Sequence, residues 1–221
     1  MTVLFVIGTI LFFLAIDWIV RRVRGTSRVP VPAQQGPVHY PVRVPGGIFF
    51  ARSHTWLNLL PSGKLRLGID DFVGRMLENP DIILLKHEGD PVKRGEPIFS
   101  LVSGDRSLFV RSPIDGEILG VNEQLGKDPL AQREQLFSDG WGYVIQPNRV
   151  AQLKELLLGP ETRAWIRDEF RRMGDFLACV GRIPGVEPSF LQDGGLPSPG
   201  ILEKMKHADW QEFEREFLQV Q

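Results

Sequence analysis

Short apolar runs separated by turn signals dominate residues 48–146, and they limit the folds open to this chain. In residues 65–69, directly after the turn at Gly63, apolar side chains alternate with polar or small ones. Alternation of this kind is typical of a strand with one buried face. Turn signals recur about every 8–12 residues, a spacing found in small β sandwiches and flattened barrels. The sequence therefore predicts a mainly β body.

Helical signals interrupt and follow this pattern. Residues 70–77 begin with an aspartate that suits an N-cap. The Asp70-Asp71 pair is therefore interpreted as a helix start rather than as two catalytic acids. A longer helix is predicted over residues 161–178, where large apolar residues recur at helical spacing. The fold class is thus mainly β with helical additions.

A last amphipathic helix is predicted over residues 201–219. Trp210, Phe213 and Phe217 lie three and four residues apart, so a helix places them on one face. A segment rich in glycine and proline, residues 181–200, precedes this helix. Two alternatives follow: the three rings pack on the β body, or they are candidate partner-binding residues that dock on another chain.

The N-terminal residues 1–24 are predicted to form a transmembrane anchor. Residues 2–16 carry no charge, and the apolar run resumes after Asp17. About 19 residues in a helix span roughly 28 Å, close to the hydrocarbon thickness of a bilayer. A cleaved signal peptide would have basic residues before the apolar run. Here Arg21 and further arginines follow it.

Those arginines also orient the anchor, because basic residues beside a span stay on the cytoplasmic side. We therefore expect a single-pass protein of the inner (cytoplasmic) membrane, with its N-terminus outside and its soluble domain in the cytoplasm. Asp17 lies one turn before Arg21, where an ion pair can form, or it meets a helix of a partner, which makes it a candidate partner-binding residue. The proline-rich residues 25–47 form an extended linker between the anchor and the body.

Composition excludes several classes of function. The formal net charge is −1, which gives no field of one sign for binding nucleic acid. The single cysteine, Cys179, permits no intrachain disulfide, and the histidines show no metal-ligand spacing. No phosphate-binding loop or nucleophile elbow is present, and His54 is interpreted as structural. The sequence predicts no enzyme activity, metal or small-molecule substrate.

The order of motifs in the β body resembles the H protein of the glycine cleavage system. The resemblance covers roughly residues 46–158. The motifs that carry it are, in chain order, His54-Thr55-Trp56-Leu57, Leu67-Gly68-Ile69-Asp70-Asp71-Phe72, Gly89-Asp90-Pro91-Val92-Lys93-Arg94-Gly95-Glu96, Ser112-Pro113-Ile114-Asp115-Gly116-Glu117-Ile118, Val121-Asn122-Glu123 and Asp139-Gly140-Trp141-Gly142-Tyr143.

The resemblance implies a lipoyl-type barrel-sandwich hybrid over residues 48–158, followed by a helical extension over residues 159–221. In that family a lysine at the tip of the hairpin between the two halves carries lipoic acid, and this arm shuttles an aminomethyl group. Here the lysine position falls at Asp105, with Arg106 beside it. A guanidinium stays protonated and is a poor acyl acceptor, so Arg106 cannot replace the lysine. We therefore expect no lipoyl cofactor.

Three functions remain open at this stage. The first is a non-lipoylated, membrane-tethered scaffold or interaction subunit, with protein partners in a membrane complex such as an electron-transfer assembly. The second is a lipoate-dependent carrier of the glycine cleavage type in one-carbon metabolism. The third is an adaptor of an export pump, but such adaptors insert a long helical hairpin between the lipoyl halves, and here a tight turn joins them.

Overall fold

The computed structural model describes residues 43–125, 135–180, 191–192 and 196–219. The predicted anchor, Asp17 and most of the predicted linker lie outside these residues. Within the described part of the chain, no helix is long and apolar enough to cross a membrane.

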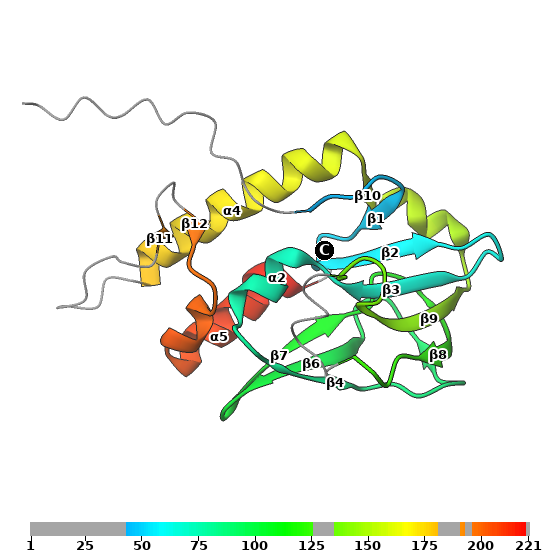
Figure 1. The fold of residues 1–221 in the computed structure, drawn as a ribbon, viewed down its shortest axis with the longest axis horizontal. Coiled ribbons are helices and arrows are strands. Elements are labelled where there is room, and N and C mark those ends of the chain that lie inside the picture. Colours follow the sequence, from blue (N-terminus) through cyan, green and yellow to red (C-terminus); the bar gives the residue numbers. More distant parts are fainter. Residues whose placement is uncertain (1–42, 126–134, 181–190, 193–195, 220–221) are drawn as a thin grey trace, which may run out of the picture. The chain divides into compact units, whose positions relative to one another are not determined.

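The body is built on two antiparallel sheets, with a further two-stranded pair (Figure 1). The seven-stranded sheet has the order β10-β1-β2-β3-β9-β8-β5, and the three-stranded sheet has the order β4-β6-β7. This arrangement confirms the predicted mainly β fold. The strands are β1 (Ile48–Phe50), β2 (Thr55–Leu59), β3 (Leu65–Ile69), β4 (Asp81–Leu84), β5 (Pro91–Val92), β6 (Pro97–Ser103), β7 (Arg106–Arg111), β8 (Gly116–Val121), β9 (Trp141–Pro147), β10 (Leu157–Leu158), β11 (Leu191–Gln192) and β12 (Leu196–Pro197).

The pairing of β2 with β3 is fixed by the residues that lie opposite one another in the two strands. Leu57 pairs with Leu67, and both side chains are fully buried. Opposite them, Trp56 pairs with Gly68, whose backbone lies directly under the indole ring. A Cβ at Gly68 would stand 2.6 Å from that ring, so only glycine allows this approach. A one-residue slip would set a side chain larger than glycine against the indole ring of Trp56, so the register is strongly specified.

Apart from α2, which lies between β3 and β4, the helical elements follow β9 in the chain. Asp70 caps α2, because its carboxylate accepts hydrogen bonds from the backbone N–H groups of Phe72 and Val73 at 3.1 Å. This confirms the predicted N-cap. The long helix α4 confirms the helix predicted over residues 161–178. The helical elements are α2 (Asp71–Met76), η1 (Val150–Glu155), α4 (Pro160–Val180), η2 (Ile201–Lys204), α5 (His207–Phe213) and η3 (Glu214–Leu218).

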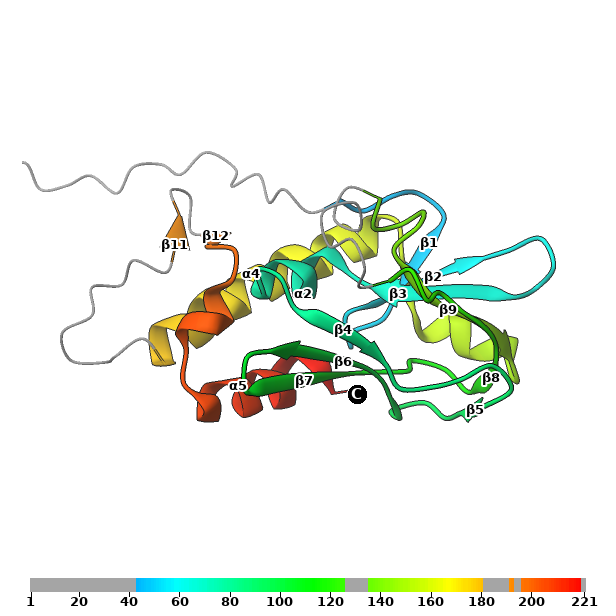
Figure 2. The same ribbon diagram turned by 60° about the horizontal axis from the view of Figure 1, so that its bottom comes forward.

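The last three helical elements, residues 201–218, are called the C-terminal segment below. Figure 2 shows α5 running beside β7, the outer strand of the small sheet. Trp210, Phe213 and Phe217 are at most 2 % exposed within the chain. Packing on the body, one of the two alternatives left open by the sequence, is therefore what the structure shows. A partner could reach these rings only if the helix left the body.

Candidate functional site

The hairpin of β6 and β7 ends in a two-residue turn, Gly104-Asp105, because Ser103 pairs directly with Arg106. Gly104 has a φ of 63°, a left-handed conformation that suits glycine in such a turn. The side chain of Asp105 is 94 % exposed. The structure thus places Asp105 at the tip of this hairpin, as predicted, and presents it to solvent.

Arg106, the neighbour of the tip, is held by the C-terminal segment. Its guanidinium donates to the backbone oxygen of Met205 and, at 3.1 Å, to that of Glu203. The same guanidinium lies 4.8 Å from the ring centroid of Trp210. Two carbonyl acceptors and a cation–π contact hold the Arg106 side chain against the C-terminal segment.

Further along β7, the C-terminal segment covers the outer edge of the strand. The backbone N–H of Phe109 donates to a carboxylate oxygen of Glu214 at 3.1 Å, and Arg111 donates to the other oxygen at 3.2 Å. Unpaired groups on an edge strand are a template for further pairing. Glu214 takes up one of these groups on β7.

The three rings of the C-terminal segment belong to one aromatic cluster. Phe213 stacks on Phe217 with ring centroids 4.9 Å apart, and Phe217 lies 5.7 Å from Phe72 of α2. The indole N–H of Trp210 donates to the backbone oxygen of Leu202 at 2.6 Å, so its polar atom is satisfied. These contacts attach the segment to the core that lies beneath the hairpin.

His54 is a structural residue, as its sequence context predicted. Its Nδ1 lies 2.8 Å from Asp70, and its ring stacks on Phe72 at 4.2 Å. Trp165 of α4 covers the ring from 5.0 Å, and His54 is fully buried. The residue links the β1–β2 turn, α2 and α4. Among the described non-glycine residues it alone has a positive φ, of 60°.

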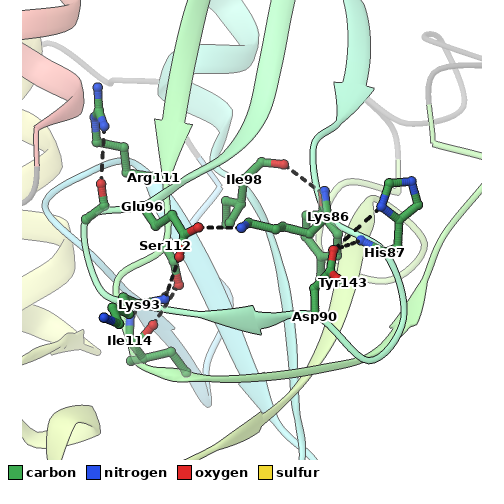
Figure 3. Close-up of polar contacts among 11 residues, drawn as sticks. Lys86, His87, Asp90, Lys93, Glu96, Ile98, Arg111, Ser112, Ile114 and Tyr143 are labelled. Carbon is green, nitrogen blue, oxygen red and sulfur yellow. Dashed lines mark hydrogen bonds and ion pairs between the residues drawn. The ribbon is translucent and has the colours of Figure 1, made fainter.

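The sequence did not single out Tyr143, which joins the two sheets (Figure 3). Its hydroxyl donates to the backbone oxygen of Ile98 at 2.7 Å and accepts from the backbone N–H of Lys86 at 3.0 Å. Burial raises the pKa of this phenol to about 12. The hydroxyl of a buried tyrosine usually finds a hydrogen-bond partner. A tyrosine within a predicted buried strand was therefore the sequence signal that could have marked Tyr143 as a contact between the sheets.

Charged groups stabilise the loop between β4 and β6, also drawn in Figure 3. Glu96 forms an ion pair with Lys86 and accepts from the backbone N–H of Lys93 at 2.9 Å. The Lys86 contact is the main cause that lowers the pKa of Glu96. The backbone N–H of His87 donates to Asp90 at 2.8 Å and lowers the pKa of that carboxyl. These contacts favour the charged form of both carboxyls and hold the turn in shape.

No group of three or more potential metal ligands comes together within the described residues. Asp71, the second member of the predicted acidic pair, bonds Arg75 one turn later at 3.3 Å. The described part therefore presents an exposed hairpin tip and a hairpin flank covered by the C-terminal segment.

The fold consists of two antiparallel sheets, of which the smaller carries the exposed β6–β7 hairpin, followed by C-terminal helices. This is a lipoyl-type β fold with helical additions. The family model described as Glycine cleavage H-protein matches residues 48–169. The chain belongs to the glycine cleavage H-protein family.

Relatives with that name match about half of this chain and most of their own length. A glycine cleavage system H protein of Stenotrophomonas maltophilia is 32 % identical over 114 residues, which is 52 % of this chain and 87 % of the relative. One of Shewanella halifaxensis is 29 % identical over 126 residues, which is 57 % of this chain and 98 % of the relative. A crystal structure of a glycine cleavage system H protein from Mycobacterium marinum has a TM-score of 0.46 and 27 % identity, and covers 53 % of this chain and 94 % of that chain.

Proposed function

We propose that this protein is a non-lipoylated H-protein-like scaffold, an interaction subunit of a membrane-associated complex rather than a carrier. The observation that supports this most is the chemistry of the hairpin. Its tip carries Asp105, and no lysine occurs between Arg94 and Gly126. Attachment of lipoate as an amide needs a primary amine, which neither a carboxylate nor a guanidinium supplies.

The C-terminal segment supports the same proposal by a separate route. A carrier arm needs a hairpin flank that is free to meet several enzymes in turn. Here Arg106 donates to the backbone of the C-terminal segment, and Glu214 bonds β7. These contacts cover the flank with the chain's own C-terminal segment, which suits a scaffold better than a carrier.

The second candidate is a lipoate-dependent carrier. Family membership favours it, since the relatives are named as glycine cleavage system H proteins. The two candidates differ in one chemical property: the presence of an acylated lysine.

Coexpression with lipoylating enzymes, followed by intact mass measurement and peptide mapping, separates the two. We expect no lipoyl mass on the wild-type chain, with a lipoylated H protein as positive control. A lipoyl group on any lysine of residues 48–158 would refute the scaffold proposal and favour the carrier.

The variant Asp105→Lys tests the assigned position. It supplies the missing amine at a side chain that is 94 % exposed. We expect modification of this variant only at residue 105, and to a lower extent than in the positive control, because Arg106 and its contacts alter the surface around the tip. The control Asp81→Lys, at an exposed position on β4, should stay unmodified.

The membrane and partner parts of the proposal need separate experiments. The charge-free N-terminal run followed by arginines supports a tether, so the chain should stay in the membrane fraction after carbonate washing. A reporter that functions only in the cytoplasm should be active when it is fused to Gln221. Purification in a mild detergent should retain protein partners. Recovery of a shortened soluble chain that starts near Gly25 would contradict the tether.

A further inference from the structure

The small sheet has two edges, and the chain covers them differently. At β7, Glu214 of the C-terminal segment takes up the backbone N–H of Phe109. At the other edge, β4 pairs with β6 on one side, and no strand of the described residues pairs with its other side. Figure 2 shows α5 beside β7, on the side of the sheet away from β4. The chain therefore closes the β7 edge and leaves β4 as an open edge strand.

The hydrogen bonds of β4 show which of its backbone groups face this open edge. The backbone N–H of Leu85, just after β4, donates to the backbone oxygen of Ile98 at 3.0 Å. In an antiparallel ladder the backbone groups of alternate residues point to the same side, so those of Ile83 also point to β6. Ile82 and Leu84 therefore direct their N–H and C=O groups away from the sheet, and no partner for these groups lies among the described residues.

The side chains of this edge are apolar and open to solvent. Residues 82–85 are two isoleucines followed by two leucines. Ile83 is 49 % exposed and Leu85 is 36 % exposed, while Ile82 and Leu84 are half-buried. Proteins usually protect an edge strand with a lysine, a proline or a bulge, and residues 82–85 contain none of these. An unprotected apolar edge of this kind accepts a further strand.

The charges at the two ends of the apolar run favour a second copy of this chain, paired antiparallel. Asp81 precedes the run, Lys86 follows it, and no charged residue lies between them. Antiparallel pairing of two copies sets the acidic end of each strand beside the basic end of the other, whereas parallel pairing would bring like charges together. Lys86 also pairs with Glu96 of its own chain, so these charges set the direction of pairing more than its affinity.

We propose that two copies of this chain pair through their β4 edges, antiparallel about a two-fold axis at Ile83. In this register Ile82 of each copy lies opposite Leu84 of the other, so their outward N–H and C=O groups bond one another. A shift by one residue would set these groups against groups already bonded to β6. The two small sheets then form one continuous sheet with the order β7-β6-β4-β4-β6-β7. The pairing involves neither the hairpin tip nor residues 1–24, and it is separate from the function proposed above.

Disulfide trapping in the full-length chain, in a mild detergent, tests the pairing. A standard interface buries about 800 Å² per partner, and a short edge contact buries less, so this dimer is weak and must be trapped. Cys179 is exposed and is first replaced by serine. Residues opposite each other in a non-hydrogen-bonded antiparallel pair have Cα atoms about 4.5 Å apart, a distance that suits a disulfide. Ile83→Cys should therefore give disulfide-linked dimers under mild oxidation.

Leu85→Cys is the matched control on the same strand, and it tests the register. In the proposed pairing the two copies of residue 85 lie about 13 Å apart along the strand, too far for a disulfide. Ile83→Cys should therefore cross-link at least about tenfold faster than Leu85→Cys, because only its thiols are held together. Leu85 lies opposite Asp81 of the other copy, so a mixture of Leu85→Cys and Asp81→Cys should give the mixed dimer, and neither variant alone should cross-link.

A proline tests the role of the outward backbone groups. Leu84→Pro, added to Ile83→Cys, removes one outward N–H and leaves the bonds to β6 in place. It should slow cross-linking by about tenfold or more, while thermal unfolding reports that the variant is folded. The proposal is overturned if Leu85→Cys cross-links as fast as Ile83→Cys, if the mixture gives no mixed dimer, or if the folded proline variant cross-links at the rate of Ile83→Cys alone. Capture of a different chain at Ile83→Cys, in place of a second copy, would also overturn it.

Discussion

Replacing Phe213 by alanine tests whether the C-terminal segment is part of the folded body. The ring is fully buried, lies 4.9 Å from Phe217 and packs edge-on to Phe176 at 6.3 Å. Truncation of a buried phenylalanine costs about 3–5 kcal/mol, because apolar contacts are lost and a cavity remains. For a chain of this size each kcal/mol lowers the melting temperature by roughly 2–4 °C. We therefore expect Phe213→Ala to melt about 6–20 °C below the wild type.

The measurement is thermal unfolding of the full-length chain followed by circular dichroism, with urea unfolding as a second probe. The urea midpoint should fall while its slope stays constant, which marks a change of stability rather than of compactness. Val150→Ala is the control: that side chain is 62 % exposed. Its removal should cost less than about 0.5 kcal/mol. If Phe213→Ala melted within about 2 °C of the wild type while partners were lost on purification, the segment would be a docking element and its burial here would not reflect the folded state.

Three further predictions concern the core. Tyr143 has a pKa of about 12, above its ordinary value of 10.0, so its contribution to stability is complete below about pH 10 and is lost as the pH rises through about 12. Urea midpoints across that range should show this loss in the wild type and not in Tyr143→Phe. Gly142→Ala would place a Cβ 2.2 Å from the ring of Phe99, so calorimetry should find it about 1–3 kcal/mol less stable. Asp70→Ala removes the cap of α2 and a partner of His54, and it should cost about 1–3 kcal/mol in chemical unfolding, whereas Asp70→Asn should cost less.

Local patterns explain why the β body and α2 could be predicted. The alternation in β3 and the aspartate before a short apolar helix are patterns that span only a few residues. For this reason Asp70 was correctly predicted as the N-cap of α2. The hairpin tip at Asp105 came from the resemblance to a family, and the two-residue turn in the structure agrees with it. That Asp105 replaces a lipoyl lysine stays a prediction until the modification is measured.

Long-range contacts explain what the sequence did not reveal. The periodicity of residues 201–219 gave the apolar face of the last helix but not the surface that covers it. Arg106 meets its acceptors 97 and 99 residues further along the chain, and no local pattern encodes such a pair.

β7 and the C-terminal segment that covers its edge lie far apart in the sequence, and this affects the chain during its synthesis. Phe109 of β7 leaves the ribosome 105 residues before Glu214, the residue that bonds its N–H. At usual rates of translation this interval lasts roughly 5–20 s, and during it the outer edge of the hairpin lies open. A nascent or prematurely terminated chain that lacks residues 201–218 therefore exposes a strand able to pair with the same strand of another copy. The C-terminal segment, which is made long after the hairpin, thus closes the edge of β7, along which two copies could otherwise pair.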